Sequence, residues 1–342
     1  MVCSVLAATA SGQKVSFVVP SKLNPPALTN PYPFAGPMMR YQQWYSAAEW
    51  TKGAKHPVRV VGIAFKTVGA GSTKILDLEI AMAAGSAFGP TASFDSNMVK
   101  DRVVVVPRGK YPLPAAKPGQ FVVKFAFPGV RQFVWDGASA VVLDIKLYDN
   151  GNKNNPHGYP FEFTVTGFNQ VSRLYSPGHP DQQLVASQFN PNQGITTQFT
   201  FEEGVTVPFG KGCPGQHNKI PVASTAGGLP KPGNRNWTHL LTNARPNRNV
   251  ALLIGESKDR WGSSKLPLDL SIIKAGGCFL YTVPTVQLNT IAIGGIANAR
   301  TPIPPVTIFV GFPAFAQWLV LDDQAPNGLM ASSQALWHII GR

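Results

Sequence analysis

The chain has 342 residues, of which 44% are hydrophobic and only 14% are charged, well below the usual quarter. This composition excludes a typical charged helical protein, and the abundant aliphatic and aromatic residues exclude a disordered one. The net charge is +13, but the chain has no block of consecutive basic residues. The charge therefore indicates either binding to an anionic extracellular polymer or envelope, or solubility alone, rather than a specific nucleic-acid partner.

Residues 1–12 have the pattern of a partial export signal. Residues 2–10 are apolar and small, and Ala8-Thr9-Ala10 fits a cleavage site, with Ala10-Ser11-Gly12 as an alternative. The segment is short and lacks a positively charged start, so an ordinary first strand is the competing interpretation. No other segment approaches the ~18 uninterrupted apolar residues of a membrane span.

Residues 13–37 are expected to form an extended, proline-rich arm that opens with a strand, VSFVV (15–19). An open strand can pair with its own sheet or with the sheet of a neighbouring copy. The second arrangement would build homo-oligomers or filaments by strand addition.

Residues 38–207 are predicted to form an N-terminal β-sandwich domain. Residues 38–50 have room for one helical turn, with Tyr41, Trp44 and Tyr45 packed inward. From residue 58 onward, short segments alternate apolar and polar residues, most strictly in ILDLEIAMAA (75–84), and this period of two is typical of strands with one buried face. Eight to ten such strands without a long helix indicate a sandwich.

Residues 208–342 repeat this pattern after a boundary rich in proline and glycine near 205–215. They carry 12 Lys and Arg against 5 Asp and Glu, a net charge of 12 − 5 = +7. The chain is therefore predicted to be all-β, with two consecutive antiparallel β-sandwich or jelly-roll-like domains.

Cys213 and Cys278 form an even pair in the second half once Cys3 is assigned to the export signal. In an oxidising compartment such a pair is expected to form a disulfide. Two buried free thiols are the alternative.

Short motifs run in order through both halves. In the second half they are GCPG (212–215), GGLPKPGN (227–234), ALLIGES (251–257), LPLDL (266–270), GGCFL (276–280), TPIPP (301–305), FAQWLVLD (315–322), APNGLMAS (325–332) and IIG (339–341). In the first half they are NPYPF (30–34), RYQQWYSAAEW (40–50), VVGIAFK (60–66), LDLEIAM (76–82), FDSNM (94–98), VVLDIKL (141–147), SRLY (172–175) and GITTQFTF (194–201).

These motifs resemble the two β-rich domains of secreted proteins from planctomycete-type bacteria. The resemblance covers nearly the whole chain after the export signal, and it implies an exported β-rich protein. It implies no activity, because these domains have no established function or catalytic motif. The chain departs from the pattern in being more basic than expected of such proteins.

Groups that could carry catalysis are scarce. The six histidines form no HExxH or other close metal pair, and no GxSxG motif is present. His338 lies in an apolar strand and is expected to be packed. The strand acids Asp77, Glu79, Asp144 and Glu162 alternate with apolar neighbours and are expected to face solvent, although a glycosidase pair of carboxylates is the third alternative for function. We expect no enzymatic activity, no cofactor and no metal.

A basic and aromatic constellation in residues 231–261 is the candidate contact site for polyanions or sugars. Exposed Arg and Trp side chains can grip acidic groups or stack on sugar rings. The competing interpretation buries the tryptophans and leaves the basic residues in water. The candidates are Arg235, Trp237, Arg245, Arg248, Arg260 and Trp261.

The sequence therefore favours a secreted, non-enzymatic structural or adhesive protein of the bacterial cell surface or extracellular matrix. Its expected partners are further copies of itself or acidic extracellular polymers. A binding module for acidic polysaccharide is the alternative, and a glycoside hydrolase comes last.

Overall fold

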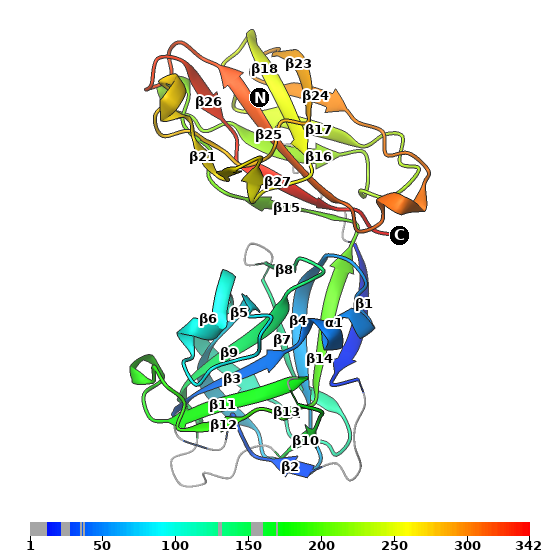
Figure 1. The fold of residues 1–342 in the computed structure, drawn as a ribbon, viewed down its shortest axis with the longest axis vertical. Coiled ribbons are helices and arrows are strands. Elements are labelled where there is room, and N and C mark those ends of the chain that lie inside the picture. Colours follow the sequence, from blue (N-terminus) through cyan, green and yellow to red (C-terminus); the bar gives the residue numbers. More distant parts are fainter. Residues whose placement is uncertain are drawn as a thin grey trace. The chain divides into compact units, whose positions relative to one another are not determined.

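The computed structural model describes residues 12–21, 28–34, 36, 38–128, 132–151, 160–168 and 170–342. The proposed export signal at residues 1–12 lies outside these residues except for Gly12. The chain divides into two compact units: the first is Lys14–Glu202, and the second is Glu203–Arg342 together with the start of the chain up to Gln13. Antiparallel sheets make up both units (Figure 1), which confirms the predicted all-β, sandwich-like class.

The first unit contains a six-stranded sheet, a smaller sheet and a three-stranded sheet. The six-stranded sheet has the order β12 (Gln188–Asn190), β11 (Val171–Pro177), β3 (Met39–Tyr45), β9 (Ala140–Asp149), β5 (Lys74–Gly85) and β6 (Met98–Leu113). The smaller sheet has the order β1 (Gln13–Val19), β14 (Thr197–Glu203), β4 (Val58–Lys66) and β7 (Phe121–Ala126), with β8 (Phe133–Trp135) also on β4. The third comprises β13 (Gln193–Ile195), β10 (Phe161–Val165) and β2 (Leu28–Asn30).

The core of the first unit gathers alternate side chains of these strands. Leu76, Leu78 and Ile80 of β5 are fully buried, as their alternation with Asp77 and Glu79 predicts. They belong to one continuous apolar cluster with the inward residues of the smaller sheet, such as Phe65, Phe199 and Phe201.

Residues 38–50 form a strand before they form a helix. β3 is followed by α1 (Ala47–Gly53), whose N-cap Ser46 accepts a hydrogen bond from the Glu49 backbone N–H at 3.2 Å. Tyr41, Trp44 and Tyr45 are buried as predicted, but every residue of β3 is buried because both of its faces are covered. This strand therefore lacks the alternation that would reveal it.

The opening strand of the proline-rich arm pairs with its own chain. β1 lies beside β14, and the Ser16 and Thr200 hydroxyls are 2.9 Å apart. The Phe17 ring packs edge-on against Trp50 of α1, with centroids 5.2 Å apart. Of the two pairings open to this strand, the structure contains the intramolecular one.

The second unit has a large sheet facing a small one. The large sheet has the order β15 (Val205–Phe209), β27 (Ala335–Ile339), β25 (Pro313–Leu321), β18 (Arg248–Gly255) and β23 (Val286–Ala292), with β26 (Met330–Ser332) also on β25. The small sheet comprises β16 (Val222–Ala226), β17 (Thr238–Thr242) and β24 (Ala297–Arg300). Because β15 pairs with β27 along its whole length, residues 205–207 belong to this unit rather than to the first.

Residues 256–285, the insertion, connect β18 to β23. The insertion contains two short hairpins, β19 (Arg260–Trp261) with β20 (Ser264–Lys265) and β21 (Leu268–Asp269) with β22 (Phe279–Leu280), and the 3-10 turn η4 (Leu270–Ile273). The other 3-10 turns are η1 (Asp95–Asn97), η2 (Pro180–Gln182), η3 (Gln216–Asn218) and η5 (Thr307–Phe309).

The two faces of the large sheet contact different apolar clusters. Val250 and Leu252 of β18 pack with Trp318 against the small sheet, whereas Leu253, on the opposite face, packs with Leu270 and other residues of the insertion. The insertion therefore covers part of the outer face of the large sheet.

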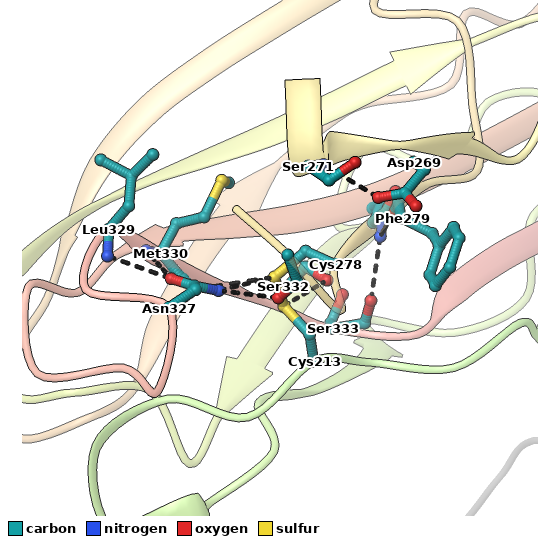
Figure 2. The surroundings of a disulfide bond; sticks show 12 residues. Cys213, Asp269, Ser271, Cys278, Phe279, Asn327, Leu329, Met330, Ser332 and Ser333 are labelled. Atoms are coloured by element: carbon teal, nitrogen blue, oxygen red, sulfur yellow. Dashed lines mark hydrogen bonds between the residues drawn. A yellow bond between two sulfur atoms is a disulfide. The ribbon is translucent and has the colours of Figure 1, made fainter. Parts of the chain in front are cut away.

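A disulfide between Cys213 and Cys278 ties the insertion to the sheet (Figure 2), as the cysteine pair predicts. The Cα atoms are 4.9 Å apart, and both residues are buried. Cys213 exchanges backbone hydrogen bonds with Ser332 of β26, while the Asn327 side-chain amide donates to the Met330 carbonyl at 2.9 Å beside Cys278. The insertion is thus covalently attached to a residue that is itself hydrogen-bonded to the sheet edge.

Candidate functional site

The second unit contains a groove of about 930 Å³ between the insertion and the outer face of the large sheet. Strand alternation sets its floor, because Ala251 and Leu253 of β18 and Leu319 and Leu321 of β25 all point outward, away from the core between the sheets. The Ala251 position is flanked by Leu319 on one side and by Asn289 of β23 on the other. The floor is therefore mainly aliphatic.

The turn η4 supplies one wall of the groove. The Asp269 carboxylate caps the turn by accepting from the Ser271 N–H at 2.8 Å (Figure 2), and Lys274 ends it in the left-handed conformation. This short turn buries Leu270 but leaves Ile272 and Ile273 exposed by 73% and 51%. Two adjacent exposed isoleucines beside a hollow apolar surface are typical of a binding site.

Amide side chains form the polar part of the groove. Asn249 of β18 and Gln287 and Asn289 of β23 line it, and the Gln287 amide donates to the Asn289 carbonyl oxygen at 2.8 Å. Asn249, Gln287 and Asn289 are all exposed, and no charged side chain lines the groove among the residues that the structure describes.

The β19–β20 hairpin contributes Trp261 to the groove, and its basic pair lies on the opposite face of the hairpin. Trp261 lines the groove and is 44% exposed, while Arg260 and Lys265 lie directly opposite each other on β19 and β20. Like charges at opposite positions of a strand pair repel each other. Gly262, with φ +57°, allows the tight turn that holds the two strands together.

The six residues predicted to contact polyanions do not form one site. Trp261 lines the groove, its strand neighbour Arg260 faces the other side of the hairpin, and the exposed Arg235 accepts through its carbonyl from Arg300 Nε at 2.7 Å. Trp237 is only 5% exposed, so its ring is not available for stacking on a ligand.

Arg245 and Arg248 are both paired with acidic residues. Arg245 Nη1 donates to Asp322 Oδ1 at 3.1 Å and to Asp323, and Arg248 contacts Asp323 at 3.2 Å. The hydrogen bond from Arg245 holds the pKa of Asp323 below its usual value. These carboxylates offset the positive charge of the two arginines and therefore weaken the attraction that the arginines could exert on a polyanion.

Two buried histidines, 99 residues apart in the sequence, meet beside Trp237. The Nε2 atoms of His239 and His338 are 2.9 Å apart, and their Nδ1 atoms lie 2.9 and 3.0 Å from the hydroxyls of Thr301 and Thr206. Burial lowers the pKa of His239 to about 4 and that of His338 well below its usual value. Both rings are therefore neutral at pH 7, and His338 is packed as the sequence predicts.

The strand acids that a glycosidase would need are all paired with basic residues. Two of the four are buried rather than solvent-facing as predicted: the Asp144 carboxylate accepts two hydrogen bonds from Arg40 at 3.1 Å, and Glu162 lies 2.6 Å from Lys66 Nζ. A basic partner compensates the cost of burying each carboxylate. Asp77 and Glu79 contact Arg108 and Arg102 at 3.2 and 3.6 Å.

The described residues contain neither a cluster of metal ligands nor a membrane-spanning helix. His, Cys, Asp and Glu side chains in this part of the chain form no group of three or more that could hold a metal ion. None of the described helices has the length and apolar character needed to cross a bilayer.

Comparison with protein-family models gives no match. A search of curated proteins gives no match either.

Proposed function

We propose that this chain is a non-enzymatic adhesive protein of the bacterial cell surface or extracellular matrix, and that it binds partner proteins through the groove of its second unit. The groove carries the proposal: aliphatic side chains line a hollow beside the exposed Ile272 and Ile273. Exposed apolar surfaces of this kind are characteristic of sites for protein contact.

An extracellular location is supported by the Cys213–Cys278 disulfide, because structural disulfides persist in oxidising environments. The absence of a membrane-crossing helix among the described residues is compatible with it. The resemblance to secreted planctomycete-type proteins adds the expectation of a bacterial source.

Protein contact accounts for the groove better than binding of an acidic polysaccharide does. A sugar site uses aromatic platforms with basic groups around them, but Trp237 is buried and Arg245 and Arg248 are paired with Asp322 and Asp323. The groove offers mainly aliphatic side chains, which match the apolar side chains of a protein.

Attachment of protein-coated fluorescent beads to the producing cells tests the proposal by flow cytometry. We expect Ile273→Asp or Leu321→Asp to reduce attachment about tenfold or more, because a charge would be buried when the groove is filled. Ile308→Asp is the matched control, since Ile308 lies outside the groove lining and is 80% exposed. Equal attachment of all three variants and the wild type would refute the proposal, and release of wild-type beads by alginate would favour the polysaccharide alternative.

A further inference from the structure

We propose that two copies of the chain associate through strand β23, which pairs antiparallel with the same strand of a second copy and so extends the large sheet across a two-fold axis. This contact uses the edge of the sheet and is independent of the partner that the groove binds. Three features of β23 support it: its open edge, its lack of the residues that guard the other edges, and its self-complementary sequence.

β23 is the outermost strand of the large sheet, and among the described residues it pairs only with β18. The Asn247 N–H donates to the Ala292 carbonyl at 2.7 Å, so the carbonyl of Ala292 points toward β18. Because backbone direction alternates along an antiparallel strand, the N–H and C=O groups of Gln287, Asn289 and Ile291 point away from β18. These three residues are exposed, and their outward groups are open to a further strand.

The other edge strands carry features that oppose the addition of a strand. Charged residues and prolines guard such edges, and very short strands offer few backbone groups. β16 has neither guard, but the Gln334 side chain accepts from the Ala223 N–H at 3.2 Å and donates to the Ala223 carbonyl at 2.8 Å, which occupies that edge. In the other described edge strands longer than three residues the guards are Lys14 of β1, Lys124 of β7, Pro107 and Pro112 of β6, Pro208 of β15 and Arg300 of β24.

β23 lacks all of these guards. Its seven residues, VQLNTIA, include no charge and no proline. Its register with β18 is unbroken from Val286 to Ala292, so no bulge bends the strand away from a neighbour. Val286 and Ile291 are 47% and 52% exposed. A long, regular and partly apolar edge of this kind is a template for pairing with another chain.

The backbone of β23 can pair with itself. A two-fold axis at Asn289 places this residue opposite the same residue of the second copy, and places Gln287 opposite Ile291. Each outward residue then exchanges hydrogen bonds with the residue opposite. The Ile291 carbonyl already accepts from the Ile293 N–H at 3.1 Å but keeps a second lone pair for this contact.

The side chains favour a second copy over an unrelated strand. The Asn289 carbonyl oxygen accepts from the Gln287 amide at 2.8 Å, and the Asn289 NH2 group can donate to the facing Asn289 across the axis. An amide both donates and accepts, so two identical strands satisfy each other, whereas an apolar side chain at this position would offer the amide no partner. No like charges meet, because the strand has none.

This symmetry closes the assembly at two copies. The contact uses β23 of both copies, and the other described edges are guarded, so a third copy has no comparable edge to join. The axis is perpendicular to the sheet, and therefore the two grooves lie on the same side of the joined sheet. Under the proposed function the dimer presents two binding sites to one surface.

Sedimentation equilibrium of the disulfide-intact full chain tests the dimer in the absence of any other protein. We expect a reversible dimer at about 100 µM, because a contact through one strand edge belongs to the small, transient class of interfaces. The net charge of +7 on residues 208–342 opposes association, so added salt should strengthen it. A monomer at this concentration, open-ended larger assemblies, or dissociation by salt would overturn the inference.

Two substitutions at the axis test the strand. Asn289→Lys brings like charges together, and Asn289→Pro removes an outward N–H from each copy without removing a bond to β18, so each should weaken dimerisation about tenfold with an unchanged circular dichroism spectrum. Val222→Lys adds the same charge to β16, whose edge Gln334 blocks, and should dimerise like wild type. Equal dimerisation of Asn289→Lys and Val222→Lys would contradict the contact.

Cysteine cross-linking tests the register. In a Cys3→Ser background, Asn289→Cys places two thiols at facing positions, where Cα atoms of a hydrogen-bonded pair are about 5.5 Å apart and within reach of a disulfide. Ile291→Cys faces Gln287 instead. On non-reducing gels after mild oxidation, we expect a covalent dimer of the first variant and little of the second. Equal cross-linking of both would refute the pairing at Asn289.

Discussion

The contact between His239 and His338 constrains the protons of both rings. With Nε2 atoms 2.9 Å apart, one nitrogen must donate and the other must accept. The ring that donates through Nε2 accepts a hydrogen bond from its threonine hydroxyl at Nδ1. The other ring accepts at Nε2 and donates from Nδ1 to its own threonine hydroxyl. The rings and Trp237 form a buried cluster in which the facing groups, Thr206, Thr301 and Trp237, are all uncharged.

This cluster predicts that acid destabilises the second unit. The pKa of His239 falls from 6.5 to about 4 on folding, so the unfolded chain binds more protons between these values. Stability is fully present above pH 6.5 and is lost as the pH falls toward 4, by up to about 1.4 kcal/mol per pH unit for each ring. Urea unfolding at pH values from 7.5 to 4.5 measures this slope.

The variant His239→Gln/His338→Gln separates the pair from other titrating groups. It should be less stable at pH 7.5 but should lose most of the slope between pH 6.5 and 4.5. His217→Asn removes an exposed histidine of the same unit and suits the positive φ of that position, so it should keep the wild-type slope. An unchanged slope in the double variant would contradict the assignment.

At the scale of elements, the disulfide is the main covalent constraint on the insertion. The bond spans a sequence separation of 65 residues and links the short hairpins and η4 to the outer face of the large sheet. The insertion has only two-residue strands and one 3-10 turn, so its own hydrogen bonds hold it weakly. The shape of the groove wall therefore depends on this link.

Removal of the disulfide is expected to lower the free energy of unfolding of the second unit. For a loop of this length the chain-entropy model gives about 4 kcal/mol as an upper value. The Cys213→Ser/Cys278→Ser variant, compared with wild type by urea unfolding, measures the loss. The variant Cys3→Ser, which leaves the bond in place, is the control, and equal stability of all three proteins would contradict the prediction.

Element by element, the regular strands were predictable and the groove was not. The alternation in residues 75–84 predicts β5 because one face of that strand is buried, whereas β3 is buried on both faces and carries no such signal. The cysteine pair was predictable because only two cysteines remain in the second half. Ile272 and Ile273 belong to a turn too short for any periodicity, and the pairing of Arg245 with Asp322 depends on residues 77 positions apart.

At the scale of the whole molecule, each unit has its own core, and the candidate features are unevenly shared. The groove, the disulfide and the histidine pair all belong to the second unit, while the first is an aromatic-rich sandwich with paired buried charges. β1 completes a sheet of its own unit. The adhesive proposal rests on the groove, because β1 already pairs with β14 of its own chain.

The disulfide also gives the groove a dependence on the compartment in which the chain is located. In a reducing cytosol Cys213 and Cys278 are thiols, and the insertion is held to the sheet by non-covalent contacts alone, including the packing of Leu270 near Leu253 and the hydrogen bonds of Gln317 with the insertion. Attachment of protein-coated beads through the groove should then fall, which flow cytometry with protein treated or not treated with dithiothreitol would measure, with undiminished attachment of the reduced protein as the contrary result. Under the proposed function, oxidation of Cys213 and Cys278 would therefore switch the groove from a weakly binding to a strongly binding form.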